Sequence, residues 1–141
     1  MCAHCEIRAV MGRYCWHVDH DEWDEWLALF ADDVSWGARG ARPFEGRTSM
    51  EKVARGLAKR RVGAAPTRHV LTVAIIEVDG DQATASGYVV VVNLVTKEIA
   101  TVGDVSIALA KLANRWRICR YEFDPVIDTT PASQAVDSSV T

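Results

Sequence analysis

Two ionisable residues in this chain stand where local structure does not require them. Asp19 closes the first helical pattern, and His69 opens a long apolar β run. An acid near a helix C-terminus is disfavoured by the helix dipole, so Asp19 needs another partner. A carboxylate that binds one imidazole nitrogen fixes the tautomer of the ring and raises its basicity. If Asp19 and His69 meet, the pair is a general base and the chain is an acid–base enzyme.

Two further residues are candidates for catalysis, each with a structural alternative. Tyr14 lies on the apolar side of the first helical pattern, so its hydroxyl either donates to a reacting oxygen or bonds to a backbone carbonyl in the core. Asp104 interrupts the third long β run. It is either a proton donor with a raised pKa in a pocket or an edge or bulge residue beside Gly103. The residue types do not separate these alternatives.

Four residues are candidates for binding a substrate. Asn93 could hydrogen-bond a substrate oxygen, or it could lie at the end of a hairpin. Tryptophans are numerous for this length, with five in 141 residues, and most of them are expected in the core. A pocket entrance lined by Trp23 and Trp36 would suit a flat aromatic or polycyclic ligand. Arg120, on the last β run, completes the set.

The whole chain has the composition of one globular domain. It has 141 residues, 49% hydrophobic and 25% charged residues, and a net charge of −3. This charge argues against nucleic-acid binding, and no apolar stretch is long enough to span a bilayer. Without a recognisable signal peptide, the expected compartment is the cytoplasm. The basic cluster 59–61 is interpreted as a solvated helix end.

Motifs for cofactors and metals are missing from the sequence. There is no glycine-rich dinucleotide or phosphate loop and no nucleophile elbow. Cys2 and Cys5 have the spacing of half a zinc site, but no second pair follows, so two reduced thiols are the preferred interpretation. We therefore expect no metal site and chemistry without a cofactor.

The patterns predict helices before strands. Helices are expected at 4–19, at a segment capped by Asp21, and at 48–60, with a short strand at 34–36. Long strands are expected at 68–78, 82–95, 99–112 and 116–123. This order predicts an α+β fold in which a cone-shaped, curved antiparallel sheet encloses a pocket capped by three helices. Residues 1–126 would form the domain and 127–141 a flexible tail, with a homodimer through the outer sheet face.

Several segments resemble one known family. They are the opening run from Arg13 to Val34, the Phe44–Arg47 segment, Thr67–His69, the turn at Asp79–Asp81, and Trp116–Arg120. Together they are similar to SnoaL-like proteins of the nuclear transport factor two-like superfamily, over about residues 5–125. The superfamily includes scytalone dehydratase, bile-acid dehydratase, ketosteroid isomerase, polyketide cyclases, dioxygenase small subunits and non-enzymatic binders.

The resemblance implies roles for the candidate residues. Asp19 and His69 are similar to the Asp–His dyad of the dehydratases, in which the histidine takes a proton α to a carbonyl. Tyr14 and Asp104 resemble the pair that stabilises a dienolate in the isomerases. The base of the isomerases would fall near Ala38, where no acid stands. The hypothesis is a dehydratase or isomerase for a hydrophobic cyclic ketone or polyketide-like molecule, with a cyclase and a non-catalytic binding module as alternatives.

Overall fold

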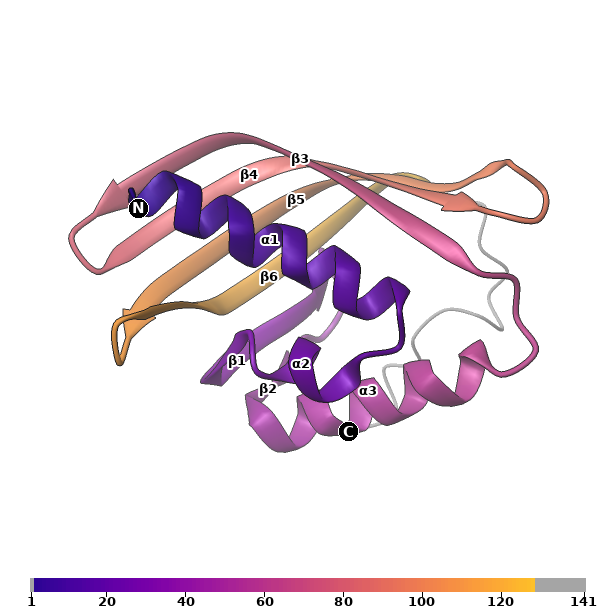
Figure 1. Ribbon diagram of the computed structural model, residues 1–141, viewed down its shortest axis with the longest axis horizontal. Coiled ribbons are helices and arrows are strands. Elements are labelled where there is room, and N and C mark those ends of the chain that lie inside the picture. The colour runs from indigo at the N-terminus through magenta and orange to yellow at the C-terminus, as the bar shows by residue number, and fades with distance from the viewer. Residues whose placement is uncertain (1, 129–141) are drawn as a thin grey trace.

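The computed structural model describes residues 2–128 of the chain. Two helices, two strands, a third helix and four further strands follow one another along it (Figure 1). The helices are α1 (Ala3–Asp19), α2 (Trp23–Leu27) and α3 (Gly46–Arg61). The strands are β1 (Phe30–Ala38), β2 (Phe44–Glu45), β3 (Thr67–Asp79), β4 (Gln82–Asn93), β5 (Ile99–Leu112) and β6 (Arg115–Asp128). The predicted α+β class is therefore confirmed.

The second helix differs from its prediction. Asp21 does not cap it, because its backbone is in the left-handed region with a φ of 58°. Glu22 occupies the N-cap position without a side-chain hydrogen bond, and α2 has only five residues. The chain then enters β1 at Phe30, four residues before the expected strand. The helical spacing of the tryptophans predicted a longer helix. Pairing of Phe30 with β6 ends the helix early and begins β1 there.

The six strands form one open sheet in the order β2-β1-β6-β5-β4-β3. All neighbouring strands are antiparallel except β1 and β6, which are parallel. The sheet is curved, but β2 and β3 remain its two edges, so it does not close into a barrel. Strand β6 runs two residues past the predicted domain end at 126, and the rest of the predicted tail, 129–141, lies outside the described residues.

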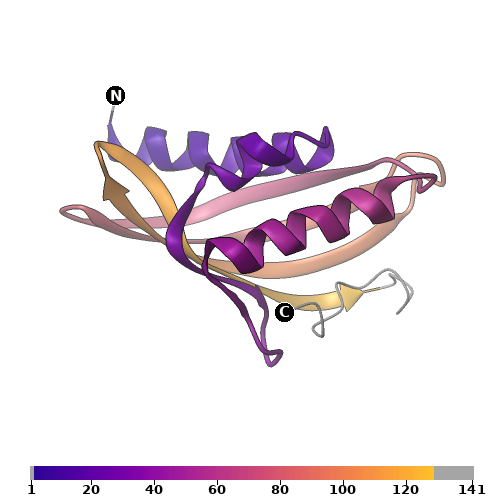
Figure 2. The same cartoon turned by 90° about the horizontal axis from the view of Figure 1, so that it is seen from below.

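The helices pack on one face of this curved sheet. Figure 1 shows α1 lying across the sheet, with α2 and α3 on the side of β1 and β2. Figure 2 shows the strands curving past α1 and α3. Between helices and sheet lies a buried core rich in aromatic rings. Its members include Tyr14, Trp26, Phe30, Phe44 and Tyr121.

A bulge in β3 changes which residues face this core. Pairing with β4 shifts register between Val73 and Ile75. His69, Leu71 and Val73 were expected to share one face with Ile75, but Ile75 is 59% exposed. Ile76 packs against the core instead. The expectation was wrong beyond Val73, because one extra residue reverses the alternation of a strand.

The bulge depends on a glycine in the neighbouring strand. A Cβ atom on Gly87 would collide with the backbone carbonyl of Thr72. We expect Gly87→Ala to lower the free energy of unfolding by about 2–4 kcal/mol, because backbone rather than a flexible side chain must move. Gly12→Ala is the matched control. Gly12 lies exposed in α1 with nothing within 4 Å of the added methyl group, so this change should stabilise by about 0.5–1 kcal/mol. Urea unfolding measures both, and equal effects would contradict the close approach.

Candidate active site

The C-terminus of α1 meets the beginning of β3 through Asp19 and His69. Asp19 is the last residue of α1, and its Oδ1 accepts a hydrogen bond from His69 Nδ1 at 2.6 Å. Its Oδ2 accepts a second bond from the backbone N–H of His69 at 2.8 Å. The carboxylate therefore binds both the ring and the main chain of the same residue. This arrangement fixes the position of the imidazole more firmly than one bond would.

The two side chains differ in exposure. Asp19 is 4% exposed and His69 is 23% exposed, so the carboxylate is buried while the imidazole reaches the surface. Because an ionised carboxylate only accepts hydrogen bonds, the proton of neutral His69 lies on Nδ1. Among residues 2–128, no group hydrogen-bonds to Nε2 of His69. The lone pair of Nε2 is therefore available to an incoming molecule.

The surroundings of Asp19 favour its charged form. Burial alone would raise the pKa of this carboxyl group, and this is the largest single effect. The hydrogen bonds from the side chain and backbone of His69, together with the charges of His69 and Arg61, outweigh burial and lower the pKa of Asp19 below its ordinary value. Asp19 is thus an anion at neutral pH and can stabilise a positive charge on the ring.

Arg61 belongs to this site, although it was interpreted from the sequence as part of a solvated helix end. It is the last residue of α3 and is 20% exposed. Its Nη2 donates to the carbonyl oxygen of Val18 at 2.6 Å, and its Nη1 donates to that of Asp19 at 3.4 Å. It also pairs with the carboxylates of Asp19 at 3.9 Å and Asp21 at 3.4 Å. Arg61 therefore satisfies the free carbonyls at the end of α1 and adds positive charge beside Asp19.

Several apolar or neutral side chains lie near the pair. The guanidinium carbon of Arg61 lies 6.0 Å from the ring centroid of Trp23. Cys15 lies one helical turn before Asp19, and burial, followed by the negative charge of Asp19, raises the pKa of its thiol to about 12. The thiol is therefore neutral. Leu71 and Val91 are partly buried on the face of the sheet that carries His69.

Tyr14 and Trp36 lie together in the aromatic core. Tyr14 is 5% exposed, and Trp36 Nε1 donates a hydrogen bond to its hydroxyl at 2.9 Å. The ring of Tyr14 stacks on Tyr121 with centroids 4.7 Å apart. Burial raises the pKa of Tyr14 well above its ordinary value, so the phenol keeps its proton. Trp36 thus contacts the candidate phenol instead of standing free at an entrance.

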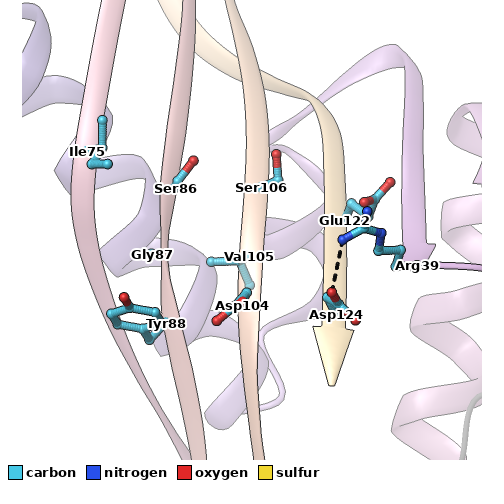
Figure 3. A pocket seen from close by; sticks show the side chains of 10 residues that line it. All are labelled: Arg39, Ile75, Ser86, Gly87, Tyr88, Asp104, Val105, Ser106, Glu122 and Asp124. Atoms are coloured by element: carbon cyan, nitrogen blue, oxygen red, sulfur yellow. Dashed lines mark hydrogen bonds and ion pairs between the residues drawn. The ribbon is translucent and has the colours of Figure 1, made fainter. Parts of the chain in front are cut away.

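Asp104 does not lie near His69. Val105 and Ile107 face the core, so the alternation of β5 places Asp104 on the opposite, outer face of the sheet. Figure 3 shows it among the side chains of a hollow that lies on the far side of the strands from the helices. This hollow has a volume of about 300 Å³ and also includes Tyr88 and Asp124. Asp104 therefore cannot act as a proton donor beside His69, which was one of the two alternatives open from the sequence.

Arg120 and Asn93 have other partners than the pair. Arg120 donates to Ser106 Oγ at 3.4 Å and lies 3.9 Å from Glu122, both of which line the outer hollow. Asn93 Oδ1 accepts the N–H groups of Val95 and Thr96 at 2.9 and 3.1 Å. Its amide therefore shapes the turn after β4, which was the alternative open from the sequence.

No obvious metal site adjoins the pair. Within residues 2–128, no three His, Cys, Asp or Glu side chains gather closely enough to hold a metal ion. None of the helices in the same range is long and apolar enough to cross a membrane.

A second hollow, of about 460 Å³, lies at the opposite ends of β3 and β4 around Val78 and Ala83. Neither of the two hollows includes Asp19 or His69.

The role of Arg61 is testable by substitution. Arg61→Gln should lower the free energy of unfolding by about 1–3 kcal/mol, because the buried carbonyls of Val18 and Asp19 lose a charged donor. The pKa of Asp19 should rise in the same variant, which NMR titration of its carboxyl carbon measures. Lys59→Gln, an exposed change in the same helical turn, is the control and should leave both quantities nearly unchanged. An Arg61→Gln protein with the stability and the pKa of the wild type would contradict this assignment.

The lowered pKa of Asp19 also predicts how stability depends on pH. A carboxylate with a depressed folded-state pKa stabilises the protein above its unfolded-state pKa, near 3.8, and this contribution disappears as the pH falls through the folded-state pKa. The wild type should therefore lose stability below about pH 4, and Asp19→Asn should show a shallower loss. Asp33→Asn, which removes an exposed carboxylate, should keep the wild-type slope. Urea unfolding at a series of pH values measures the slopes, and identical slopes for Asp19→Asn and wild type would refute a stabilised carboxylate.

Comparison with solved structures shows the same fold in several proteins. An NTF2-like protein with a cystatin-like fold from Novosphingobium aromaticivorans has a TM-score of 0.78 and 24% identity, over 93% of this chain and 85% of that chain. A variant of Rv3472, a protein of unknown function from Mycobacterium tuberculosis, has a TM-score of 0.74 and 26% identity, over 96% and 86%. A protein provisionally described as a scytalone dehydratase, also from N. aromaticivorans, has a TM-score of 0.75 and 23% identity, over 88% and 84%.

Sequence comparison gives the family. No curated protein matches the chain. A family model for the SnoaL-like domain matches residues 1–122, which includes both members of the pair and all elements through most of β6. The match agrees with the resemblance found in the motifs and with the fold of the solved structures. The chain therefore belongs to the SnoaL-like domain family.

Proposed function

We propose that this protein is a cofactor-independent acid–base enzyme, a dehydratase or isomerase that acts on a hydrophobic cyclic ketone or polyketide-like molecule. The observation that carries the proposal is the double hydrogen bond from His69 to Asp19. It leaves Nε2 of a partly exposed imidazole free to take a proton. The family includes dehydratases and isomerases, and the solved structure described as a scytalone dehydratase agrees with this reaction class.

In the proposed reaction, His69 Nε2 removes a proton from the carbon next to the substrate carbonyl. The electron pair of that C–H bond moves toward the carbonyl oxygen and forms an enolate. The imidazolium then carries N–H groups on both nitrogens, and Asp19 stabilises its charge through Nδ1. In a dehydration, the enolate re-forms the carbonyl as a β-hydroxyl group leaves, and this group takes the proton from Nε2 as water. In an isomerisation, the same proton returns to another carbon.

The enolate oxygen needs a hydrogen-bond donor. Asp104 lies on the outer face and is removed from this role. Tyr14 remains a candidate, because it lies on the same helix as Asp19. Burial raises the pKa of its phenol, so the hydroxyl keeps the proton that it would share with the enolate oxygen. Trp36 donates to the hydroxyl oxygen of Tyr14 and thereby polarises the phenol proton. In this proposal, the phenol turns toward a bound substrate from its position beside Tyr121.

The apolar residues near the dyad support a hydrophobic substrate. Cys15 precedes Asp19 by one turn of α1, Leu71 and Val91 share the sheet face of His69, and Trp23 lies beside Arg61. All four are partly buried, so they keep some apolar surface in contact with solvent. A cyclic ketone would remove this surface from water, and its only strong polar contact would be at the reacting end.

A cyclase could use the same base, because the carbanion would then attack a second carbonyl of the substrate.

A non-catalytic binding module is the second candidate. It is favoured by the aromatic core, where Tyr14, Trp26, Trp36 and Tyr121 fill the space between helices and sheet.

The homodimer also remains a prediction. Val70, Ile75 and Tyr88 expose 52%, 59% and 60% of their surface on the outer sheet face, which is where a second copy was expected.

Exchange of a substrate proton tests the proposed base without knowledge of the natural substrate. The full-length protein is incubated in D₂O with a panel of hydrophobic cyclic β-hydroxy ketones, and NMR measures deuterium incorporation at the α carbon and formation of enone. For a ketone that the wild type converts, His69→Gln and Asp19→Asn should each reduce the rate by about 10²–10⁴-fold.

The chain offers a matched control in a second His–carboxylate pair. His17 Nδ1 lies 3.0 Å from Glu22 Oε1, so His17→Gln removes an imidazole of the same kind outside the proposed site. This variant should keep the wild-type rate. An unchanged rate in His69→Gln would refute the mechanism. Ligand binding without exchange or turnover in the wild type would instead favour the binding module.

A further inference from the structure

The first turn of α1 carries two cysteines whose sulfur atoms are close together. Cys2 is the N-cap residue of α1, and Cys5 is the third residue of the helix. Their Sγ atoms are joined by a hydrogen bond of 3.0 Å. An S–S bond is about 2.0 Å long, so a small rotation of either side chain brings the sulfurs to bonding distance. Both residues are exposed, so a reagent in solution reaches them.

The helix start makes the two thiols chemically different. Cys2 Sγ accepts a hydrogen bond from the backbone N–H of Cys5 at 3.4 Å, in the way an N-cap oxygen does. The side-chain hydrogen bond between Cys2 and Cys5, followed by this backbone bond, lowers the pKa of Cys2. The same thiol–thiol bond raises the pKa of Cys5. Cys2 is therefore the better thiolate, and Cys5 retains its proton until a later step.

We propose that Cys2 and Cys5 form a redox-active dithiol that exchanges with disulfides in solution. The other two cysteines contrast with this pair, because Cys15 and Cys119 are both less exposed. Burial raises the pKa of each of them. The site lies at the opposite end of α1 from Asp19, and its chemistry is independent of the proposed enzyme activity.

The exchange proceeds in two balanced steps. The Cys2 thiolate attacks one sulfur of a low-molecular-weight disulfide such as glutathione disulfide, which forms a mixed disulfide and releases one thiolate. Cys5 then loses its proton to solvent and attacks the sulfur of Cys2, which forms the Cys2–Cys5 bond and releases the second thiolate. Two electrons pass from the protein to the disulfide reagent. Because the bond is exposed, added thiol should reverse it readily.

Peptide mapping by mass spectrometry tests the proposal. The reduced full-length protein is incubated with glutathione disulfide, quenched with acid and digested without reduction. We expect the wild-type peptide with Cys2 and Cys5 to lose two hydrogens as an internal disulfide, and dithiothreitol to restore them. Cys15 and Cys119 should remain thiols and serve as internal controls.

Two variants separate the roles of the cysteines. In Cys5→Ser, the internal disulfide should be lost completely and a glutathione adduct should accumulate on Cys2. In Cys2→Ser, the internal disulfide should also be lost and the adduct on Cys5 should form more slowly. Serine is a good N-cap residue, so Cys2→Ser keeps the helix start, which circular dichroism verifies. Wild-type protein that carries separate adducts on both cysteines, or none, would overturn the proposal.

Discussion

The site depends on one carboxylate that joins two elements far apart in the sequence. Asp19 ends α1 and binds both the imidazole and the backbone N–H of His69 at the start of β3. The backbone bond fixes where the strand begins relative to the helix, and the side-chain bond fixes the orientation and tautomer of the ring. A buried anion would destabilise the fold if it were unpaired. The same contact is therefore a structural joint and the proposed catalytic unit.

Arg61 connects this joint to the third helix. Its guanidinium binds the last carbonyls of α1 and lies beside the carboxylates of Asp19 and Asp21. The ends of α1 and α3 and the start of β3 therefore meet at one point. The C-terminus of α1 carries the negative end of the helix dipole, which repels the carboxylate of Asp19. The positive charge of Arg61 offsets this repulsion. The awkward placement of an acid at a helix end is thus explained by partners from two other elements.

The sequence predicted the elements well and the partners unevenly. Helical spacing and β alternation located α1, α3 and the four long strands, because these patterns reflect burial of one face. The Asp19–His69 contact followed from two residues that lacked local partners. The role of Arg61 was missed, because no local pattern shows which of the three adjacent cations at 59–61 binds the end of α1. The position of Asp104 stayed open, because alternation identifies residues that share a face without saying which face meets the helices. The β3 bulge between Val73 and Ile75 was missed, although Gly87 in the paired strand was a signal for a close backbone approach there.

The central claim is that Asp19 fixes His69 as the Nδ1–H tautomer with Nε2 free to accept a proton. NMR of the ¹⁵N-labelled imidazole at a pH where the ring is neutral measures this most directly, because protonated and unprotonated nitrogens have distinct chemical shifts. The account predicts the Nδ1–H form for His69 in the wild type and a mixture of tautomers in Asp19→Asn, with His17 unchanged between the two proteins. An Nε2–H tautomer in the wild type, or a His69 signal unaffected by Asp19→Asn, would contradict it.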